Sequence, residues 1–550
     1  DPRVRRTVVA RVITALAGLL VLFVLFVPNQ VSRLTPGEFV RIPVEGLVVV
    51  ALVLVLPARA GRVVAALVGV VLGLLTIVKI FDMGFFAALD RPFDPVLDWT
   101  FVAAGVDFLT RSIGRVGAIG AVVAAAVLAV AVLFLMALSV LRLTRLVVRH
   151  RTTATRTVAV LGVVWVICAV SGVQIVPGVP VADKSASTLT YNRALEARAS
   201  LQDRQTFAAQ AAIDPFRNAA GNQLLTGLRG KDVLVVYVES YGRVAIEDPE
   251  FAPQVGAVLD AGNRRLRAAG FAARSALLTS STAGGGSWLA HSTLLSGLWI
   301  DNQRRYNDLV TSDRLTLNGA FHRAGWRTVG VMPAITRAWP EGAFFGYDRV
   351  YDDSSLGYRG PRFNFGSMPD QYTLSAFQRA ERATPGRAPV MAEIALLSSH
   401  APWTPIPQLI PWDNVGDGSA FAAMAAAGGP PDVVGGGSTR TDYRRSIEYS
   451  LNTLISYVET YGDDNLVVVF LGDHQPAPVV TGEGASRDVP ITILARDPAV
   501  LDQISGWGWQ DGLKPNPQAP VWRMDAFRDR FLTAFGPQTR PTLSSAPTPR

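Results

Sequence analysis

The sequence predicts an α-helical membrane domain of five spans followed by an α/β domain with a mainly parallel, doubly wound sheet. Residues 1–182 consist largely of long apolar stretches rich in Val, Leu and Ala. From residue 183 onward, short apolar runs alternate with helical patterns. This alternation indicates parallel strands whose two faces are covered by helices.

Charge divides the chain at the same place. Residues 1–182 contain 17 basic and 8 acidic side chains, whereas the remainder contains 35 and 36. The net charge of +8 therefore belongs to the membrane part, where basic residues anchor cytoplasmic loops. Because the second domain is close to neutral, nucleic acid is not an expected partner. The one cysteine, Cys168, lies in an apolar segment, so no internal disulfide is expected.

Five apolar segments qualify as membrane spans: 7–27, 43–57, 62–80, 115–141 and 157–177. A bilayer core about 30 Å thick needs roughly 20 helical residues, so the second segment is short. The first could instead be a cleaved signal peptide, but it lacks a small-x-small cleavage site and four further segments follow it.

Basic residues predict the orientation of these spans. They cluster before the first span, between the second and third, and between the fourth and fifth, so that all three clusters fall on one side. The clusters are Arg3, Arg5 and Arg6; Arg59 and Arg62; and Arg142, Arg145, Arg149, Arg151 and Arg156. The positive-inside rule then places the N-terminus in the cytoplasm. Five spans place the rest of this multi-pass chain outside the cytoplasmic membrane.

The segment 183–230 is predicted to be a juxtamembrane helical linker, either lying on the membrane surface or solvated. Residues 231–535 form the predicted catalytic domain, and 536–550 a disordered tail, since the tail has too little apolar content to pack. The expected strands are 232–239, 327–332, 390–398, 465–473 and 489–495.

Residues that can perform chemistry follow these apolar runs, at the strand ends where sites of open α/β sheets gather. Glu239, His400 and the pair Asp473 and His474 each end a run, and Ser287 opens a helix after three glycines. Two carboxylates and an imidazole suit Mn²⁺, Zn²⁺ or Mg²⁺, with the Ser287 oxygen as a fourth ligand. A helix N-terminus also favours an anionic group, which predicts phosphate or sulfate chemistry.

The chain resembles the alkaline phosphatase and sulfatase superfamily, and most of all the membrane-bound lipoteichoic acid synthases. "SWLAHSTLLSG" at 287–297 has the spacing of the sulfatase signature C/S-x-P-S-R-x-x-L-L-T-G, and "VYVESYGR", "FLGDHQP" and "LLSSHAPW" resemble its metal and phosphate stretches. The resemblance implies Ser287 as nucleophile and a phosphate or leaving-group contact for His400. It implies a metal site formed by Glu239, Asp473, His474 and Ser287.

The departures from the signature are informative. Leu289 replaces its proline and His291 its arginine, so conversion of Ser287 to formylglycine is not expected, and a plain hydroxyl suits phosphoryl transfer. The substrate cluster of the synthases corresponds here to "MPAITRAWPEGAFFGYD", which lacks the histidine. The candidate substrate-binding residues are Arg337, Trp339, His291 and Arg243.

These features together predict a metal-dependent membrane phosphotransferase with one divalent cation, Mn²⁺ being preferred over Mg²⁺ or Zn²⁺. It would move a phosphoryl-alcohol group such as glycerol phosphate from a lipid donor, for example phosphatidylglycerol, to a cell-envelope glycan or glycolipid acceptor through a covalent Ser287 intermediate. Two alternatives stay open at this point: a phosphodiesterase, phosphatase or sulfatase-type hydrolase, and a non-catalytic membrane sensor or assembly partner.

Overall fold

The structure is a computed structural model of the chain, and it describes residues 2–176, 179–336, 338–363, 368–427 and 437–537. The chain forms two compact units, Asp1–Ala87 with Arg91–Asp203 and Ala88–Asp90 with Arg204–Arg550. The boundary between them falls inside helix α6 (Ser185–Ala212), whereas the sequence places the end of the membrane domain at residue 182. The predicted tail lies outside the described residues from 538 onward.

The membrane unit is built from five apolar helices: α1 (Pro2–Phe26), α2 (Val44–Val55), α3 (Ala58–Leu89), α4 (Trp99–Arg149) and α5 (Arg151–Ser171). Within the described residues, four helices are long and apolar enough to cross a membrane, and α2 is not among them. Its 12 residues span about 18 Å at 1.5 Å per residue. The predicted count of five spans is therefore not confirmed: α2, the segment predicted to be short, lies between Pro43 and Pro57, whose rings limit helix extension.

Buried polar side chains of α3 have partners inside the membrane unit. The Lys79 ammonium donates hydrogen bonds to the carbonyls of Val24 and Val27 at 2.9 and 2.7 Å, at the end of α1. Asp82 is wholly buried and accepts from Asn29 at 2.8 Å and Arg193 at 2.6 Å. These bonds satisfy the charges, so both residues hold the helices together.

The second unit contains a nine-stranded sheet in the order β12-β6-β11-β10-β5-β9-β7-β8, with β13 paired to β6. The strands are β5 (Asp232–Val238), β6 (Ala272–Thr279), β7 (Arg327–Met332), β8 (Arg349–Asp352), β9 (Val390–Leu396), β10 (Leu466–Gly472), β11 (Asp488–Ala495), β12 (Gln510–Asp511) and β13 (Val521–Arg523). All five predicted strands are confirmed. The neighbours β10, β5, β9, β7 and β8 are parallel, whereas β11 runs antiparallel to β10 and β6.

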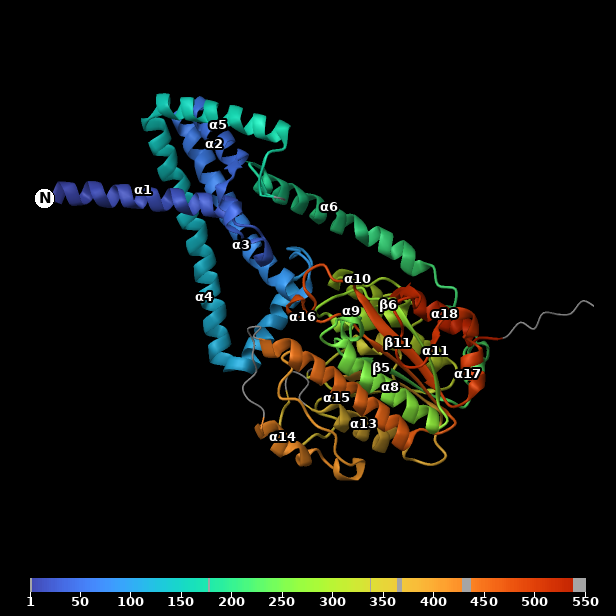
Figure 1. Cartoon of the computed structure of the whole chain (residues 1–550). Helices are drawn as coiled ribbons and strands as arrows, with labels where there is room; N and C mark the ends of the chain where they lie inside the picture. Colours follow the sequence, from blue (N-terminus) through green and yellow to red (C-terminus); the bar gives the residue numbers. More distant parts are fainter. Residues whose placement is uncertain (1, 177–178, 337, 364–367, 428–436, 538–550) are drawn as a thin grey trace, which may run out of the picture. The chain divides into compact units, whose positions relative to one another are not determined.

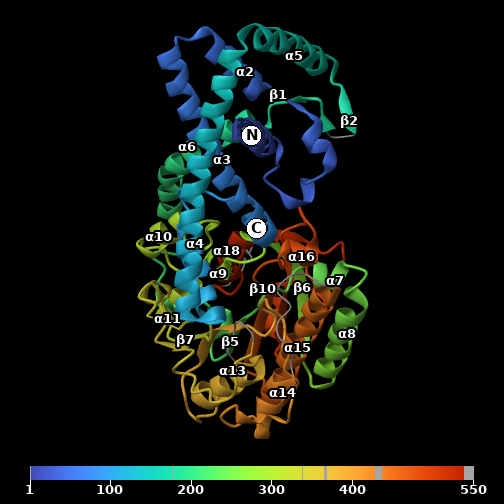
Figure 2. The same cartoon turned by 90° about the vertical axis from the view of Figure 1, so that its left-hand side faces the viewer.

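Helices cover both faces of this sheet (Figures 1 and 2). On one face lie α8 (Ala252–Ala268) and α15 (Gly437–Tyr461), and on the other lie α9 (Ser287–Ser296), α11 (Leu317–Arg323) and α18 (Phe527–Ala534). Side chains alternate along a strand, so Leu234, Val236 and Val238 of β5 enter the core cluster that includes α8 and α15. Tyr237 and Glu239 accordingly belong to the α9 face.

Shorter elements complete the two units. The helices are α7 (Val244–Glu247), α10 (Gln303–Val310), α12 (Gly342–Phe345), α13 (Asp370–Phe377), α14 (Ala422–Ala427), α16 (Pro478–Thr481) and α17 (Pro498–Asp502). Two-stranded pairs near the membrane helices are formed by β1 (Ile42–Pro43) with β4 (Ala182–Asp183), and by β2 (Gln174–Val176) with β3 (Val179–Pro180).

Asp232, at the start of β5, is expected to be a main electrostatic support of the sheet. Its buried carboxylate accepts from Arg382 at 3.0 Å, from Arg387 at 2.7 Å and from the Val390 amide at 3.0 Å. Asp232→Asn should lower the free energy of unfolding by about 3–5 kcal/mol, because it removes the buried carboxylate between Arg382 and Arg387 and leaves Arg382 only Asp463 as an acidic partner. Thermal unfolding of the detergent-solubilised chain measures this change. Asp464→Asn is the matched control. The ion pair between Asp464 and Arg496 is exposed, so this substitution should change stability by less than about 0.5 kcal/mol.

Candidate metal and nucleophile site

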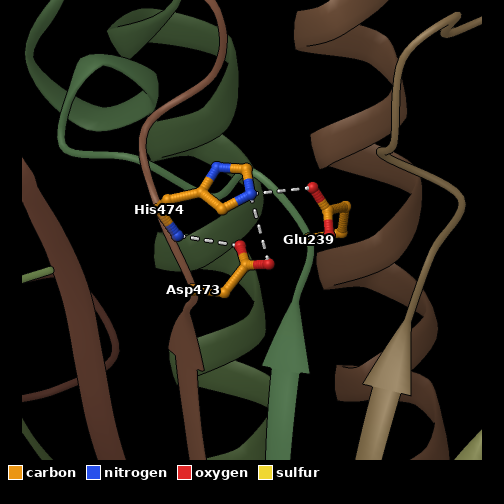
Figure 3. A group of neighbouring side chains, drawn as sticks. All are labelled: Glu239, Asp473 and His474. Atoms are coloured by element: carbon orange, nitrogen blue, oxygen red, sulfur yellow. Dashed lines mark hydrogen bonds and ion pairs between the residues drawn. The ribbon is translucent and has the colours of Figure 1, made fainter. Parts of the chain in front are cut away.

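The ends of two neighbouring parallel strands bring the predicted metal-binding residues together. Val238 and Gly472 are paired in the register of β5 and β10, so Glu239, which follows β5, lies beside Asp473 and His474, which follow β10 (Figure 3). Gly472 permits this close turn: a Cβ there would lie 1.9 Å from the Tyr241 carbonyl oxygen. All three functional side chains are buried.

Ser287 reaches this group from the first residue of α9. The preceding Gly286 has φ of 81°, a left-handed conformation that glycine adopts without strain, and it turns the chain into the helix. The Ser287 hydroxyl oxygen lies 3.0 Å from Glu239 Oε2 and 3.2 Å from His474 Nε2. The loop serine is therefore directly beside two of the residues predicted to bind a cation.

The donor set fits a divalent cation. One ligand atom from each of Glu239, Asp473 and His474 can be chosen so that all lie within 4.8 Å of one another. His474 Nδ1 is hydrogen-bonded to the Gln475 carbonyl at 2.8 Å, which fixes the tautomer and leaves the Nε2 lone pair facing the carboxylates. Asp473 Oδ2 is buried with no hydrogen-bond partner among the described residues. An unpartnered buried carboxylate oxygen is costly, and a cation would satisfy it.

The pKa values of the three side chains reflect crowded charges. Burial, followed by the charge of Glu239, raises the pKa of Asp473 to about 6. Burial opposes ionisation of Glu239 as well, but the charge of His474 and several hydrogen bonds outweigh it and lower the pKa of Glu239. Burial likewise disfavours the His474 imidazolium, yet the two carboxylates raise its pKa. The site thus favours positive charge between the two carboxylates.

His400 lies beyond the carboxyl end of β9, the strand next to β5. Its Nδ1 is hydrogen-bonded to the carbonyl of Ala401. Desolvation lowers the pKa of His400 to about 4, so the imidazole is neutral near pH 7. Because Nδ1 carries the proton that is bonded to Ala401, Nε2 of the neutral ring is an acceptor and suits a hydrogen bond from an acceptor hydroxyl. The predicted roles of contacting the phosphate and of protonating a leaving oxygen would each need a proton on Nε2.

The candidate substrate-binding residues lie in different surroundings. Arg337 falls outside the described residues. Trp339 donates from Nε1 to the Tyr306 hydroxyl at 3.1 Å and stacks on Phe345 with centroids 5.6 Å apart. Arg243 donates to Glu247 at 2.7 Å and Asp488 at 2.9 Å, so its charge is engaged by protein carboxylates. Substrate contact by Trp339 and Arg243 stays a prediction.

His291 has two close protein partners in place of a visible substrate contact. Its Nδ1 lies 3.0 Å from Glu393 Oε1, and its ring stacks on Tyr237 with centroids 3.6 Å apart and planes inclined by 11°. The sequence-based candidates did not include Glu393. A signal was present, however: Glu393 is the one charged residue inside the apolar run "VMAEIALLS", and a charge within a buried strand requires partners.

Comparison with protein-family models and with curated proteins finds no match. Among solved structures, the chain is similar to lipoteichoic acid synthase LtaP from Listeria monocytogenes, with 15% identity, a TM-score of 0.38 and coverage of 57% of this chain and 74% of that one. It is similar to the integral membrane phosphoethanolamine transferase EptA from Neisseria meningitidis, with 13% identity, a TM-score of 0.43 and 95% coverage of each chain.

A third similar structure is a protein of the alkaline phosphatase superfamily from Vibrio parahaemolyticus, with 13% identity, a TM-score of 0.35 and coverage of 56% of this chain and 68% of that one. At this degree of similarity the function has to be inferred from the site itself.

Proposed function

We propose that the chain is a metal-dependent membrane phosphotransferase in which Ser287 is the nucleophile. The observation that carries the proposal is the position of the Ser287 hydroxyl at the start of α9, within 3.2 Å of both Glu239 and His474. Asp473 Oδ2, which has no hydrogen-bond partner among the described residues, lies in the same group. Ordinary helix N-termini do not need a hydroxyl bonded to a buried carboxylate and a buried imidazole.

Glu239, Asp473, His474 and Ser287 would hold one divalent cation, for which mixed oxygen and nitrogen ligands leave Mn²⁺, Mg²⁺ and Zn²⁺ as possibilities. When bound, such a cation promotes deprotonation of a neighbouring hydroxyl and offsets negative charge on phosphoryl oxygens. The protein itself directs the Ser287 hydroxyl toward Glu239 Oε2. The N–H groups at the start of α9 favour the anionic phosphoryl group.

The reaction consists of two displacements. Ser287 Oγ forms a bond to the phosphorus of the donor, and the bond from phosphorus to the lipid oxygen breaks. The electron pair stays on the lipid oxygen, which gains the proton that Ser287 loses. An acceptor hydroxyl then forms the new bond to phosphorus and loses its proton, while Ser287 Oγ leaves and is protonated again. The neutral His400 ring would accept a hydrogen bond from that hydroxyl through Nε2.

A phosphoryl-alcohol group from a lipid donor, such as glycerol phosphate from phosphatidylglycerol, is the proposed cargo, and a cell-envelope glycan or glycolipid is the proposed acceptor. The membrane helices support a lipid donor because they keep the chain at the bilayer. If water replaces the acceptor, the same residues make a hydrolase. The two activities differ in the second displacement alone.

The proposed location of the second unit is extracytoplasmic. Helix α1 carries Arg3, Arg5 and Arg6 at its start, and the next basic pair, Arg59 and Arg62, opens α3. These clusters share one side of the membrane only if the chain crosses again through α2, which the bilayer can accommodate by thinning around a short helix. Labelling of single cysteines introduced near residues 60 and 230 of a Cys168→Ala chain in intact cells tests this topology. Labelling of both or of neither would contradict it.

Intact-mass analysis with candidate lipids tests the function. The full chain, loaded with Mn²⁺, is incubated with phosphatidylglycerol vesicles and with vesicles of other phospholipids. A mass increase equal to a phosphoryl-alcohol group, mapped to the peptide that contains Ser287, is the expected result. Transfer of the group to an added glycolipid identifies a transferase, whereas release to water identifies a hydrolase. Absence of any adduct and any product with every lipid would refute the proposal.

A further inference from the structure

A buried carboxylate in the middle of the sheet lies beneath the nucleophile helix. Glu393 is the fourth residue of β9, which pairs with β5 on one side and β7 on the other. Its side chain is 1% exposed. Burying a carboxylate at this position costs several kcal/mol unless partners satisfy it. The folded state therefore depends on the hydrogen-bond partners of Glu393.

The partners of Glu393 come from three separate elements. His291 of α9 lies 3.0 Å away through Nδ1, Asn318 of α11 donates through Nδ2 at 3.1 Å, and the Tyr347 hydroxyl, which follows α12, donates to the same oxygen as Asn318. One side chain of the sheet therefore holds three segments that are distant in sequence. Removing its charge would loosen all three at once.

His291 transmits this restraint to the nucleophile. It lies four residues after Ser287, and residues at i and i+4 share one face of a helix. Its ring is fixed between Glu393 and the face of Tyr237, whose strand ends at the metal-binding Glu239. With only 10 residues in α9, one fixed side chain strongly constrains its rotation.

The third partner extends the network toward a predicted substrate residue. Tyr347 lies against Trp339 with ring centroids 6.1 Å apart, and Trp339 also packs on Phe345. The network thus runs from the helix that bears Ser287, through Glu393, to the aromatic cluster around Trp339.

We propose that Glu393 is a positioning residue for phosphoryl transfer: through His291 it fixes the rotation of α9, and hence the Ser287 hydroxyl, relative to the metal ligands and the Trp339 cluster. This inference rests on the proposed function. Neither Glu393 nor His291 needs to touch the reacting phosphoryl group. A displacement of about 1 Å at a reacting atom is enough to slow a reaction by roughly 10²-fold.

The test uses the Mn²⁺-loaded full chain and bis(4-nitrophenyl) phosphate, an activated phosphodiester whose nitrophenolate burst reports modification of Ser287. Glu393→Gln and His291→Phe should each lower the burst rate constant by about 10–100-fold with unchanged metal content. His291→Asn, which keeps a donor near the Nδ1 position, should recover most of the rate. Glu393→Gln and His291→Phe break the same contact. The double variant should therefore be no slower than the slower of the two single variants.

Glu381→Gln is the matched control. Glu381 is also a buried carboxylate, bonded to Arg327 and to the Tyr351 hydroxyl, but none of these partners belongs to the site. It should lower the melting temperature as much as Glu393→Gln does and leave the burst rate unchanged. If Glu393→Gln does not fold, the comparison of His291→Phe with His291→Asn decides the question by itself.

Two outcomes would overturn the inference. One is a burst rate within twofold of the parent for both Glu393→Gln and His291→Phe. The other is a double variant whose rate falls by the product of the two single effects. Hydrogen exchange of the α9 amides provides a readout independent of activity, and it should be faster in Glu393→Gln than in Glu381→Gln. A parent chain without any burst would count against the proposed function. The α9 exchange then decides the positioning claim, and equal exchange in the two variants refutes it.

Discussion

Ser287→Ala is expected to abolish the covalent phosphoryl adduct and to lower transfer by about 10⁴–10⁶-fold, the range seen when the nucleophile of a covalent catalyst is removed. The reason is geometric. The Ser287 hydroxyl is the nucleophilic group within 3.2 Å of both Glu239 and His474 among the hydrogen bonds of this site, and a methyl group can form no bond to phosphorus. Intact mass after incubation with the donor lipid, and product formation, measure the two effects.

The fold should survive this substitution, because Ser287 is half-buried at the first position of a helix and alanine is a good helix former. Affinity for the cation should fall, because one of the four proposed ligands is lost. Ser287→Thr is the informative companion. It keeps a hydroxyl at the same position and should retain an adduct, at a reduced rate caused by the extra methyl group. An adduct of undiminished yield in Ser287→Ala would assign the nucleophile to another residue.

The strands of the sheet could largely be predicted from sequence because each is a short apolar run. "DVLVVYV" and "LVVVFLG" are buried along their whole length, and such continuous runs indicate central strands. The strands β6, β8, β12 and β13 were not foreseen, and neither was the direction of β11. Strand β6 was missed because Arg274 and Ser275 interrupt its apolar pattern. The antiparallel direction of β11 was also missed, although the connection from β10 contains only the four-residue α16, too little for a crossover helix.

For the membrane helices, the sequence predicted the positions of the segments better than their lengths. Composition located all five apolar segments, but it overestimated the second, since Val44–Val55 is shorter than the predicted span 43–57. It underestimated the third, which continues to Leu89 in place of ending at 80. Hydrophobicity identifies the segments, whereas local capping and buried partners, such as those of Asp82, determine where a helix ends.

The proximity of Glu239, Asp473 and His474 was predictable because it follows from topology: side chains after parallel strands meet at one edge of the sheet. The surroundings of the other candidates were not, since they depend on pairs distant in sequence. The pairing of Arg243 with Glu247 could be predicted from their spacing of four residues. The pairing with Asp488 could not, because only the fold brings Asp488 to Arg243. In the same way, His291 meets Glu393 across 102 residues.

Asp473→Asn is expected to remove the bound cation and, with it, adduct formation. The two oxygens of Asp473 have different tasks. Oδ1 accepts from the amides of Ser240 and His474 at 2.8 Å each, which asparagine can also do through its carbonyl oxygen. Oδ2 has no hydrogen-bond partner among the described residues and lies 3.6 Å from His474 Nε2; at that place asparagine would present an amide group that cannot ligate a cation. The substitution therefore preserves the structural contacts and removes one ligand.

The effect on stability separates this mechanism from simple damage to the fold. Without added metal, Asp473→Asn should be at least as stable as the parent, because it removes a buried carboxylate whose ionisation is disfavoured by burial and by Glu239. With Mn²⁺ at about 100 times its dissociation constant, the parent should gain about 2.7 kcal/mol of stability, while the variant should gain almost nothing. Metal analysis of the purified chains and thermal unfolding with and without Mn²⁺ measure both differences.

Asp370→Asn is the matched control and should retain the cation. Asp370 is as buried as Asp473, but it is bonded to Ser450 and to the amides of Leu397 and Ser398. A full equivalent of metal in Asp473→Asn would show that the buried oxygen is not a ligand, and the activation of Ser287 would then require a different explanation.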